Sequence, residues 1–202
     1  MRRVTLFLDY QNVYHRAREA FCSRNAPASE GQVDPLARGV LLTSRVPARG
    51  LAGVRLYRGR PSGPRDPRSY AAFRRQSAAQ MQGGRGLVTV VARSLRYPPD
   101  WPHRPVQEKG IDVALAVDIV MVAREECDVA IVFSSDTDLL PALEAVIALQ
   151  SGQAPRCEVA AWAAPGVRPR ALSVRGVRLR QHLLGPDDFH AVADGTDYAR
   201  EG

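Results

Sequence analysis

Residues 109–143 read KGIDVALAVDIVMVAREECDVAIVFSSDTDLLPAL and contain a long apolar segment, a short apolar run and an acidic turn. Up to Val122 the segment is apolar almost all the way round a helix, interrupted by Asp118, so we expect this helix to be covered on most sides. Val129–Phe133 is too short for a helix and rich in β-branched residues, which predicts a strand buried on both faces. The acidic turn SSDTD follows this strand at 134–138.

The N-terminal segment ends in the same way, because the apolar run Arg3–Asp9 predicts a buried strand that stops at a carboxylate, with Asn12 soon after. Further strands are predicted over Gly53–Gly59, Leu87–Leu95, Cys157–Trp162 and, at an edge, Val177–Leu184. Helices are predicted over Gln11–Phe21, from Asp34-Pro35, over Pro67–Gln82, after Asp138 to near Gly152, and as a last turn near Asp188–Ala193.

The alternation of strands and helices predicts an α/β fold with right-handed crossovers and a mainly parallel sheet between two helical layers. With strand order 3-2-1-4-5, the chain reverses direction between the strand that ends at Asp9 and the strand that precedes Asp136. Ligands of open α/β sheets bind at such a switch point. Asp112, at the start of the long helix, is expected on the same rim, so three distant carboxylates should converge.

The totals favour one domain spanning residues 1–202, with residues 163–202 as an extension that packs on it. Three scattered cysteines and the lack of a signal peptide or membrane span predict a cytoplasmic protein that does not bind membranes. A net charge of +7 and a pI near 9.9 favour polyanionic partners. Lys109 is the only lysine beside 27 arginines, so part of the basic excess reflects codon bias.

Clustered carboxylates repel one another unless a proton or a cation lies between them. Mg²⁺ or Mn²⁺ prefers oxygen ligands and typically binds through a few carboxylates together with phosphate oxygens of a substrate. No P-loop, GxSxG or CxxC motif competes for the chemistry. The acidic residues therefore predict a site for a divalent cation that acts on phosphate esters.

Taken together, Asp9 with Asn12, the segment Lys109-Gly110-x-Asp112, Asp118 and the turn 134–138 resemble the NYN domains of the PIN-like nuclease superfamily. The resemblance covers about residues 4–162. It implies a three-layer α/β/α PIN-like, Rossmann-like sandwich and an Mg²⁺- or Mn²⁺-dependent ribonuclease.

The resemblance also implies roles for individual residues of this chain. It assigns Asp9, Asp112 and Asp136 to the metal, Asp138 to the metal or to water positioning, and Asn12 to orienting the carboxylates. Ser134 and Ser135 are second-tier candidates. Many PIN-like nucleases carry a further acidic residue after the second strand, and here that segment offers only Asp66 among arginines.

Several of these residues have plain structural alternatives. Asp138, Asp112 and Asn12 could each cap a helix, which is worth about 1 kcal/mol. Asp118 lies six residues beyond Asp112, which on a helix means about 9 Å along the axis and about 120° around it. It cannot share one small ion with Asp112, so we rank it second-tier, as an outer group or as a buried partner of an arginine.

Basic side chains near the carboxyl ends of the strands are candidates for binding a nucleic acid, although an ordinary solvated face explains most of them equally well. The compact ammonium of Lys109 could neutralise a phosphate. The candidates for binding are Lys109, Arg58, Arg60, Arg74 and Arg75.

The sequence thus favours a metal-dependent nuclease acting on RNA, with single strands favoured and DNA still open as a substrate. Association into a homodimer also stays open. The main alternative is a non-catalytic RNA-binding module that keeps the PIN-like fold. A phosphatase of the haloacid dehalogenase type is disfavoured, because that chemistry needs an aspartate at the position of Gln11.

Overall fold

The computed structural model describes residues 1–125, 127–149 and 156–200, and its centre is a six-stranded sheet of order β3-β2-β1-β4-β5-β6. Every neighbouring pair of strands is parallel. The strands are β1 (Arg2–Asp9), β2 (Arg49–Arg60), β3 (Val88–Ser94), β4 (Val129–Phe133), β5 (Cys157–Trp162) and β6 (Gln181–Leu184).

Six α-helices and one 3₁₀ turn connect these strands in the described residues. They are α1 (Tyr10–Phe21), α2 (Pro35–Ser44), α3 (Pro67–Gly83), α4 (Ile111–Glu125), η1 (Thr137–Leu139), α5 (Leu140–Ala148) and α6 (Pro186–Val192). Aspartates begin three of the helices: the side chains of Asp9, Asp34 and Asp66 each accept a hydrogen bond from a backbone N–H in the first turn. Such caps satisfy N–H groups that have no partner inside a helix.

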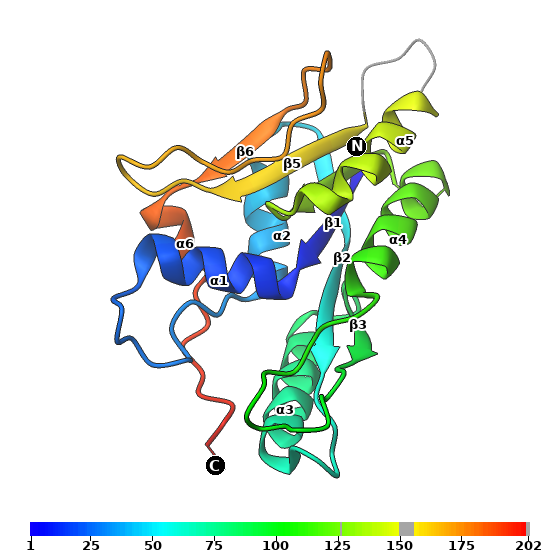
Figure 1. Ribbon diagram of the computed structural model, residues 1–202. Helices are drawn as coiled ribbons and strands as arrows, with labels where there is room; N and C mark the ends of the chain where they lie inside the picture. Colours follow the sequence, from blue (N-terminus) through cyan, green and yellow to red (C-terminus); the bar gives the residue numbers. More distant parts are fainter. Residues whose placement is uncertain (126, 150–155, 201–202) are drawn as a thin grey trace.

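The helices cover the sheet on both faces and enclose two apolar clusters. On one face, alternate residues of β1 such as Leu6 and Leu8 pack against α1, α2 and α6. On the other face, Phe7 and Tyr57 pack against α4 and α5. Figure 1 shows α2 and α4 on opposite sides of β1 and β2. The arrangement is a three-layer α/β/α sandwich.

The chain reverses its direction of winding at β1. From β1 it crosses to β2 and then β3, and from β3 it returns through α4 to β4, on the other side of β1. β1 therefore pairs with β2 along one edge and with β4 along the other. The carboxyl ends of β1 and β4 lie next to each other where the two crossovers diverge, which is the place at which such sheets leave a crevice.

The predicted fold class is confirmed, and so is the strand order 3-2-1-4-5, which β6 extends by one parallel strand beside β5. β4 and β5 have the predicted bounds. β2 begins earlier than predicted, because Arg49 already pairs with Arg2 of β1 despite the glycines that follow it. The predicted end of the helix after β4, near Gly152, lies outside the described residues.

The expectation that α4 is covered on most sides is wrong for one of its faces. Val113, Val117 and Met121 are 66%, 54% and 50% exposed. They are spaced four residues apart and so form one stripe along the helix. The sheet and α5 cover the other faces of α4, where Leu115 and Ile119 are fully buried. A nearly uniform apolar sequence could not show which side would be left uncovered.

The segment after β5 returns to the same core. Leu172 and Leu179 of the connection to β6 are buried in the cluster beneath α4 and α5, and Phe189 of α6 is buried beside α1. None of the described helices has the length and apolar content needed to cross a membrane.

Candidate metal-binding site

Asp9 is the last residue of β1, and it is buried among apolar neighbours at the carboxyl end of the sheet. Its Oδ1 accepts a hydrogen bond from the backbone N–H of Asn12 at 3.2 Å. Its Oδ2 accepts one from the Ser134 hydroxyl at 2.8 Å. The first bond starts α1 and the second ties the end of β1 to the end of β4, so the carboxylate is held in place from both sides.

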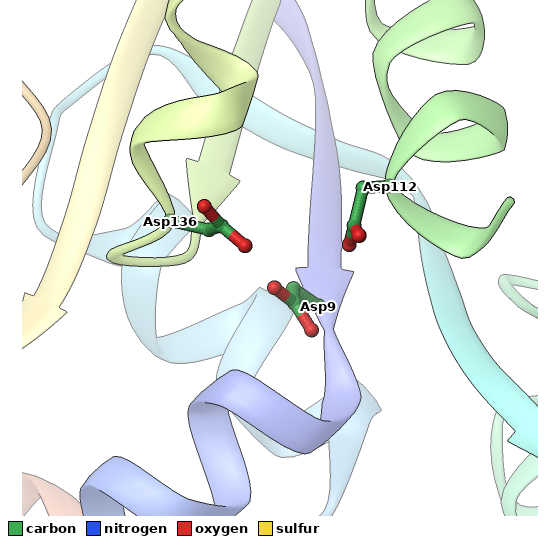
Figure 2. A group of neighbouring side chains, drawn as sticks. All are labelled: Asp9, Asp112 and Asp136. Carbon is green, nitrogen blue, oxygen red and sulfur yellow. The ribbon is translucent and has the colours of Figure 1, made fainter. Parts of the chain in front are cut away.

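Asp136 lies in the turn after β4, and Asp112 lies in the first turn of α4. The backbone N–H of Asp136 donates to the Ser134 hydroxyl at 3.1 Å, and its side chain accepts from the N–H of Asp138 at 3.0 Å. Asp136 therefore begins the η1 turn and shares Ser134 with Asp9. In Figure 2 the carboxylates of Asp9, Asp112 and Asp136 point toward one another from three different elements.

One oxygen of each of these three carboxylates lies within 4.8 Å of the others. Burial raises the pKa of Asp9 to about 6, and the charges of Asp112 and Asp136 add to that increase. The pKa of Asp112 is raised as well, by burial and then by Asp136 and Asp138. No ion pair with a basic side chain is recorded for any of the three within the described ranges. The negative charge of the cluster is not balanced by these side chains.

This donor set fits a hard divalent cation. The ligand atoms are all carboxylate oxygens, the type that Mg²⁺ and Mn²⁺ prefer, and their separation leaves room for one ion among them. A cation would also remove the repulsion that raises the pKa values of Asp9 and Asp112. Asp9 is buried, whereas Asp112 and Asp136 are accessible to solvent, so a substrate can approach from one side.

Comparison with models of protein families gives a match to the NYN domain over residues 3–150, which is most of the chain. The chain belongs to the NYN domain family. This membership and the acidic cluster agree with a nuclease-type function and with metal binding. Searches of curated proteins and of solved structures returned no match.

The NYN domain places the other predicted site residues around this cluster. Asp138 is exposed in the η1 turn, close enough to raise the pKa of Asp112, but it is not one of the three grouped carboxylates. It does not cap the following helix, because the N-cap of α5 is Leu139, without a side-chain hydrogen bond, and the cap of η1 is Asp136. The side-chain oxygen of Asn12 accepts hydrogen bonds from the N–H and the hydroxyl of Ser135, at 2.9 and 3.0 Å. Asn12 thus joins the start of α1 to the turn after β4.

Asp118 lies away from the cluster, as the helical geometry predicted. Its carboxylate accepts a hydrogen bond from the Tyr57 hydroxyl at 2.6 Å and lies 3.2 Å from Nη1 of Arg55. These contacts join α4 to β2. Of the two roles predicted for Asp118, the structure shows an arginine partner, although the carboxylate is half-buried with a side chain 31% exposed.

Glu108 is an acidic neighbour of the cluster that the sequence reasoning missed. Its Oε1 accepts a hydrogen bond from the N–H of Gly59, at the end of β2, at 3.1 Å. Burial raises its pKa, and Asp9 and Asp112 contribute to the increase. A Cβ on Gly59 would lie 2.7 Å from the same oxygen and closer still to Cδ2 of Leu95, so both side chains would have to shift. The acidic residue sought after the second strand is supplied by the segment before α4, close to the motif that begins at Lys109.

Four of the five basic candidates lie wholly or partly at the surface, and the fifth, Arg58, is packed inside the protein. Lys109, Arg60 and Arg74 are exposed, and Arg60 donates a hydrogen bond to the Ser94 hydroxyl. Arg75 is half-buried and donates to the backbone carbonyl of Tyr198 at 2.9 Å.

Arg58 is used inside the protein. Its guanidinium lies 4.1 Å from the ring centre of Tyr10 and 4.9 Å from that of Phe73, and it donates to Gln76 at 2.7 Å. Because these contacts fix Arg58 between α1 and α3, it is not available to a ligand in this structure.

Proposed function

We propose that this NYN domain is a metal-dependent ribonuclease that hydrolyses phosphodiester bonds at the Asp9, Asp112 and Asp136 cluster. One observation carries the proposal. Three carboxylates from three separate elements converge with no basic side chain paired to them in the described chain, at a cost that only a cation or protons would remove.

In the proposed mechanism, Asp9, Asp112 and Asp136 hold Mg²⁺ or Mn²⁺ through carboxylate oxygens. When bound, the cation lowers the pKa of water and neutralises charge that develops on the phosphate. Ser134 and Asn12 keep Asp9 in position through the two hydrogen bonds that it accepts. Asp138, exposed beside Asp112, helps to hold the metal or to orient the attacking water.

Glu108 is proposed as the fourth acidic group of the site. It lies in the segment before α4, accepts a hydrogen bond from Gly59 near the end of β2, and its charge interacts with Asp9 and Asp112. Its role is to complete the set of oxygens around the metal or its waters. Glu108→Gln tests this role, because it removes the charge and keeps an oxygen that can accept the hydrogen bond from Gly59.

The substrate is proposed to be RNA, with a single strand favoured because a single strand can be held by exposed cations along its backbone. Lys109 adjoins the first turn of α4, next to Asp112, and is the group proposed to hold the phosphate near the metal. Arg60, Arg74 and Arg75 are proposed to track the strand farther along.

The deciding experiment measures cleavage of a labelled single-stranded RNA in Mn²⁺ by the wild type and by an Asp9→Asn, Asp136→Asn double variant. We expect cleavage by the wild type and a loss of at least about 10²-fold in the variant, the scale of removing a key electrostatic group. Asp187→Asn, on an exposed aspartate of α6, is the matched control and should cleave normally.

The same samples test the alternative of a non-catalytic RNA-binding module. That alternative would be supported, and the nuclease proposal overturned, by two results together. RNA affinity would be unchanged by EDTA and by both aspartate substitutions, and the wild type would cleave neither RNA nor DNA.

We also propose a location in the cell, a role for the C-terminal residues and a state of association. The cysteines are free thiols, which suits the reducing cytoplasm. Residues 163–200 supply β6 and α6 to the core, so we propose that they act with the NYN domain as one unit. A homodimer stays a prediction; the exposed stripe of α4 supports it, and sedimentation of Val117→Glu against the wild type tests it.

A further inference from the structure

A cavity of about 290 Å³ opens beside the acidic cluster, between α1, the ends of β4 and β5, and residues 164–170. Its volume is at the lower end of the range of small-molecule pockets, so it suits one nucleotide unit better than a longer segment. Asn12, Ser134 and Ser135 line the cavity, and these residues also hold Asp9 and Asp136 in place. The cavity and the proposed metal site therefore share a wall.

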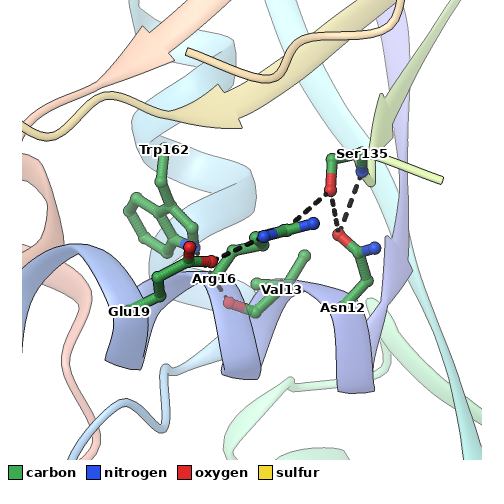
Figure 3. Close-up of polar contacts among 6 residues, drawn as sticks. All are labelled: Asn12, Val13, Arg16, Glu19, Ser135 and Trp162. Carbon is green, nitrogen blue, oxygen red and sulfur yellow. Dashed lines mark hydrogen bonds and ion pairs between the residues drawn. The ribbon is translucent and has the colours of Figure 1, made fainter. Parts of the chain in front are cut away.

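One side of the cavity is apolar and aromatic. Phe133 and Trp162 line it, and their ring centres lie 5.0 Å apart. The indole N–H of Trp162 donates to the backbone carbonyl of Val13 at 2.9 Å, which fixes the ring on α1 (Figure 3). Since this donor is already used, Trp162 offers the cavity apolar surface. Both rings are otherwise packed in the core, with Phe133 2% and Trp162 6% exposed, so only their edges reach the cavity. The apolar lining around these edges suits a base better than a ribose or a phosphate.

Three arginines also line the cavity, together with Glu19, whose pKa Arg16 and then Arg170 lower. Arg168 and Arg170 are exposed, and no hydrogen bond or ion pair with the described residues is recorded for either. Arg16 is more constrained, because it pairs with Glu19 at 2.5 Å and donates from Nε to the Ser135 hydroxyl at 3.1 Å. Figure 3 shows Arg16 extending along α1 between Trp162 and Ser135. Two arginines thus remain for an anionic group at the mouth of the cavity.

A fourth cation lies behind the aromatic side. Arg38 of α2 is fully buried, and its guanidinium carbon lies 4.7 Å from the ring centre of Phe133 and 4.6 Å from that of Trp162. None of its three side-chain nitrogens has a hydrogen-bond partner among the described residues. Burial lowers the pKa of Arg38, and the charge of Asp34, at the start of the same helix, partly offsets this.

We propose that this cavity binds one nucleotide of the substrate strand, next to the phosphate that is cleaved. The base lies against the apolar lining that includes the edges of Phe133 and Trp162, and the nucleotide's own phosphate lies against Arg168 and Arg170. This inference rests on the proposed nuclease function. In it, the cavity is the part of the protein that holds the substrate strand and sets the position of cleavage.

The hydrogen bonds along the shared wall explain how the pocket and the cluster would be kept in register. Arg16 donates to Ser135, Ser135 donates to Asn12, and the N–H of Asn12 donates to Asp9. A nucleotide seated against this wall is held by groups whose positions are fixed relative to Asp9. Its adjacent phosphate is thereby directed to the acidic cluster, the kind of positioning on which hydrolysis depends.

The first test measures binding of 5′-UMP and 5′-AMP to the Asp9→Asn, Asp136→Asn protein in EDTA, so that neither metal nor cleavage contributes. We expect both nucleotides to bind more tightly than uridine or ribose 5-phosphate, because each of these lacks one half of the recognised unit. Arg168→Ala with Arg170→Ala should weaken binding at least about 10-fold, the scale of losing two charge-assisted contacts. The matched control, Arg175→Ala with Arg178→Ala, removes the same charge from exposed arginines outside the cavity and should change binding less than about two-fold.

The second test measures RNA cleavage by the same arginine variants with Asp9 and Asp136 intact. Loss of Arg168 and Arg170 should raise KM several-fold and shift the preferred cleavage positions, with kcat nearly unchanged. The control pair should keep the wild-type pattern.

The outcomes separate the two proposals. Equal effects of the two arginine pairs on mononucleotide binding would overturn the pocket. Mononucleotide binding that depends on Arg168 and Arg170, combined with unchanged RNA cleavage in their absence, would mean that the cavity takes a free nucleotide and would overturn the assignment to the strand. A wild type that cleaves nothing but binds mononucleotides in the cavity would refute the nuclease and leave the nucleotide pocket standing.

Discussion

The two ends of the parallel sheet differ in the side chains that surround their buried carboxylates. At the carboxyl end, Asp9 lies against Asp112 and Asp136, and its pKa is raised to about 6 by burial and by these like charges. At the amino end, Glu158 of β5 is similarly inaccessible, with a side chain 8% exposed, yet Arg49, Arg180 and His182 surround it. The same sheet therefore balances buried charge at one end and leaves it unbalanced at the other.

The amino-end site is complete without any ligand. Arg49 of β2 binds Glu158 through two hydrogen bonds of 2.8 and 2.6 Å, and His182 of β6 lies 2.7 Å away. Arg180 is a more distant partner at 3.8 Å. Burial alone would raise the pKa of Glu158, but the hydrogen bonds from Arg49 and His182 outweigh it and hold the pKa at about 2. Balanced charge of this kind holds strands together, whereas unbalanced charge attracts an ion.

The largest expected effect is the loss of stability in Glu158→Gln. This substitution leaves Arg49 buried without its partner, and breaking a buried pair costs about 3–5 kcal/mol of unfolding free energy. Urea denaturation measures the change. Glu144→Gln, on an exposed glutamate of α5, should change stability by less than about 0.5 kcal/mol, and similar losses in both variants would refute the contrast.

The contribution of Glu158 should also depend on pH in a direction set by its lowered pKa. A carboxylate with a folded pKa of about 2, against an ordinary value of 4.5, stabilises the fold fully above pH 5 and loses that contribution as the pH falls toward 2. The difference in unfolding free energy between the wild type and Glu158→Gln should shrink by roughly 3 kcal/mol over that range. A difference that does not depend on pH would show that Glu158 is not held ionised.

Mn²⁺ should stabilise the carboxyl end and leave the amino end unaffected. A ligand at 100 times its Kd adds about 2.7 kcal/mol to the unfolding free energy of the protein that binds it. We expect thermal unfolding of the wild type to shift upward with Mn²⁺, and Asp9→Asn to lose most of the shift. A variant at the other end, Arg180→Ala, should keep it, since the ion pair that Arg180 forms within the described residues is with Glu158.

Without metal, Asp9→Asn should be more stable than the wild type at pH 7. Ionising Asp9 in the fold is unfavourable, by roughly 3 kcal/mol for a pKa raised from 3.8 to about 6. Asparagine keeps the oxygen that caps α1, so we expect a net gain of about 2 kcal/mol in EDTA. Denaturation in EDTA at pH 7 measures this gain, and a destabilised variant would show that the cluster is not under electrostatic strain.

The smallest effect is expected at Arg38, whose charge is buried like that of Arg49 but has no carboxylate partner. Burial lowers the pKa of Arg38 to about 9, and contact with Phe133 and Trp162 offsets part of this cost. Arg38→Met should therefore change the unfolding free energy by at most about 1 kcal/mol, while Arg49→Met should lose about 3–5 kcal/mol. Equal losses of unfolding free energy in Arg38→Met and Arg49→Met would show that paired and unpaired buried charges do not differ in this protein.

The sequence was sufficient for residues whose role follows from local pattern and topology. Asp9 and Asp136 follow apolar strands that had to be central, and Asp112 opens the helix between them, so their convergence could be predicted before the coordinates. Glu108 could not be found in this way, because its position depends on a hydrogen bond to Gly59, which is distant in sequence. Arg58 looked like a surface cation, and only the packing of Tyr10 and Phe73 around it showed otherwise.

By itself, the amino-acid sequence determined the alternation of strands and helices and, once the order 3-2-1-4-5 was assumed for the first five strands, the meeting of three aspartates at the switch point. These features follow from hydrophobic periodicity and the handedness of crossovers, which act over short stretches of chain. Only the tertiary structure decided which charges are paired, which face of α4 stays exposed and where a cavity opens beside the cluster. Those outcomes depend on the packing of side chains from distant segments, which no local pattern specifies.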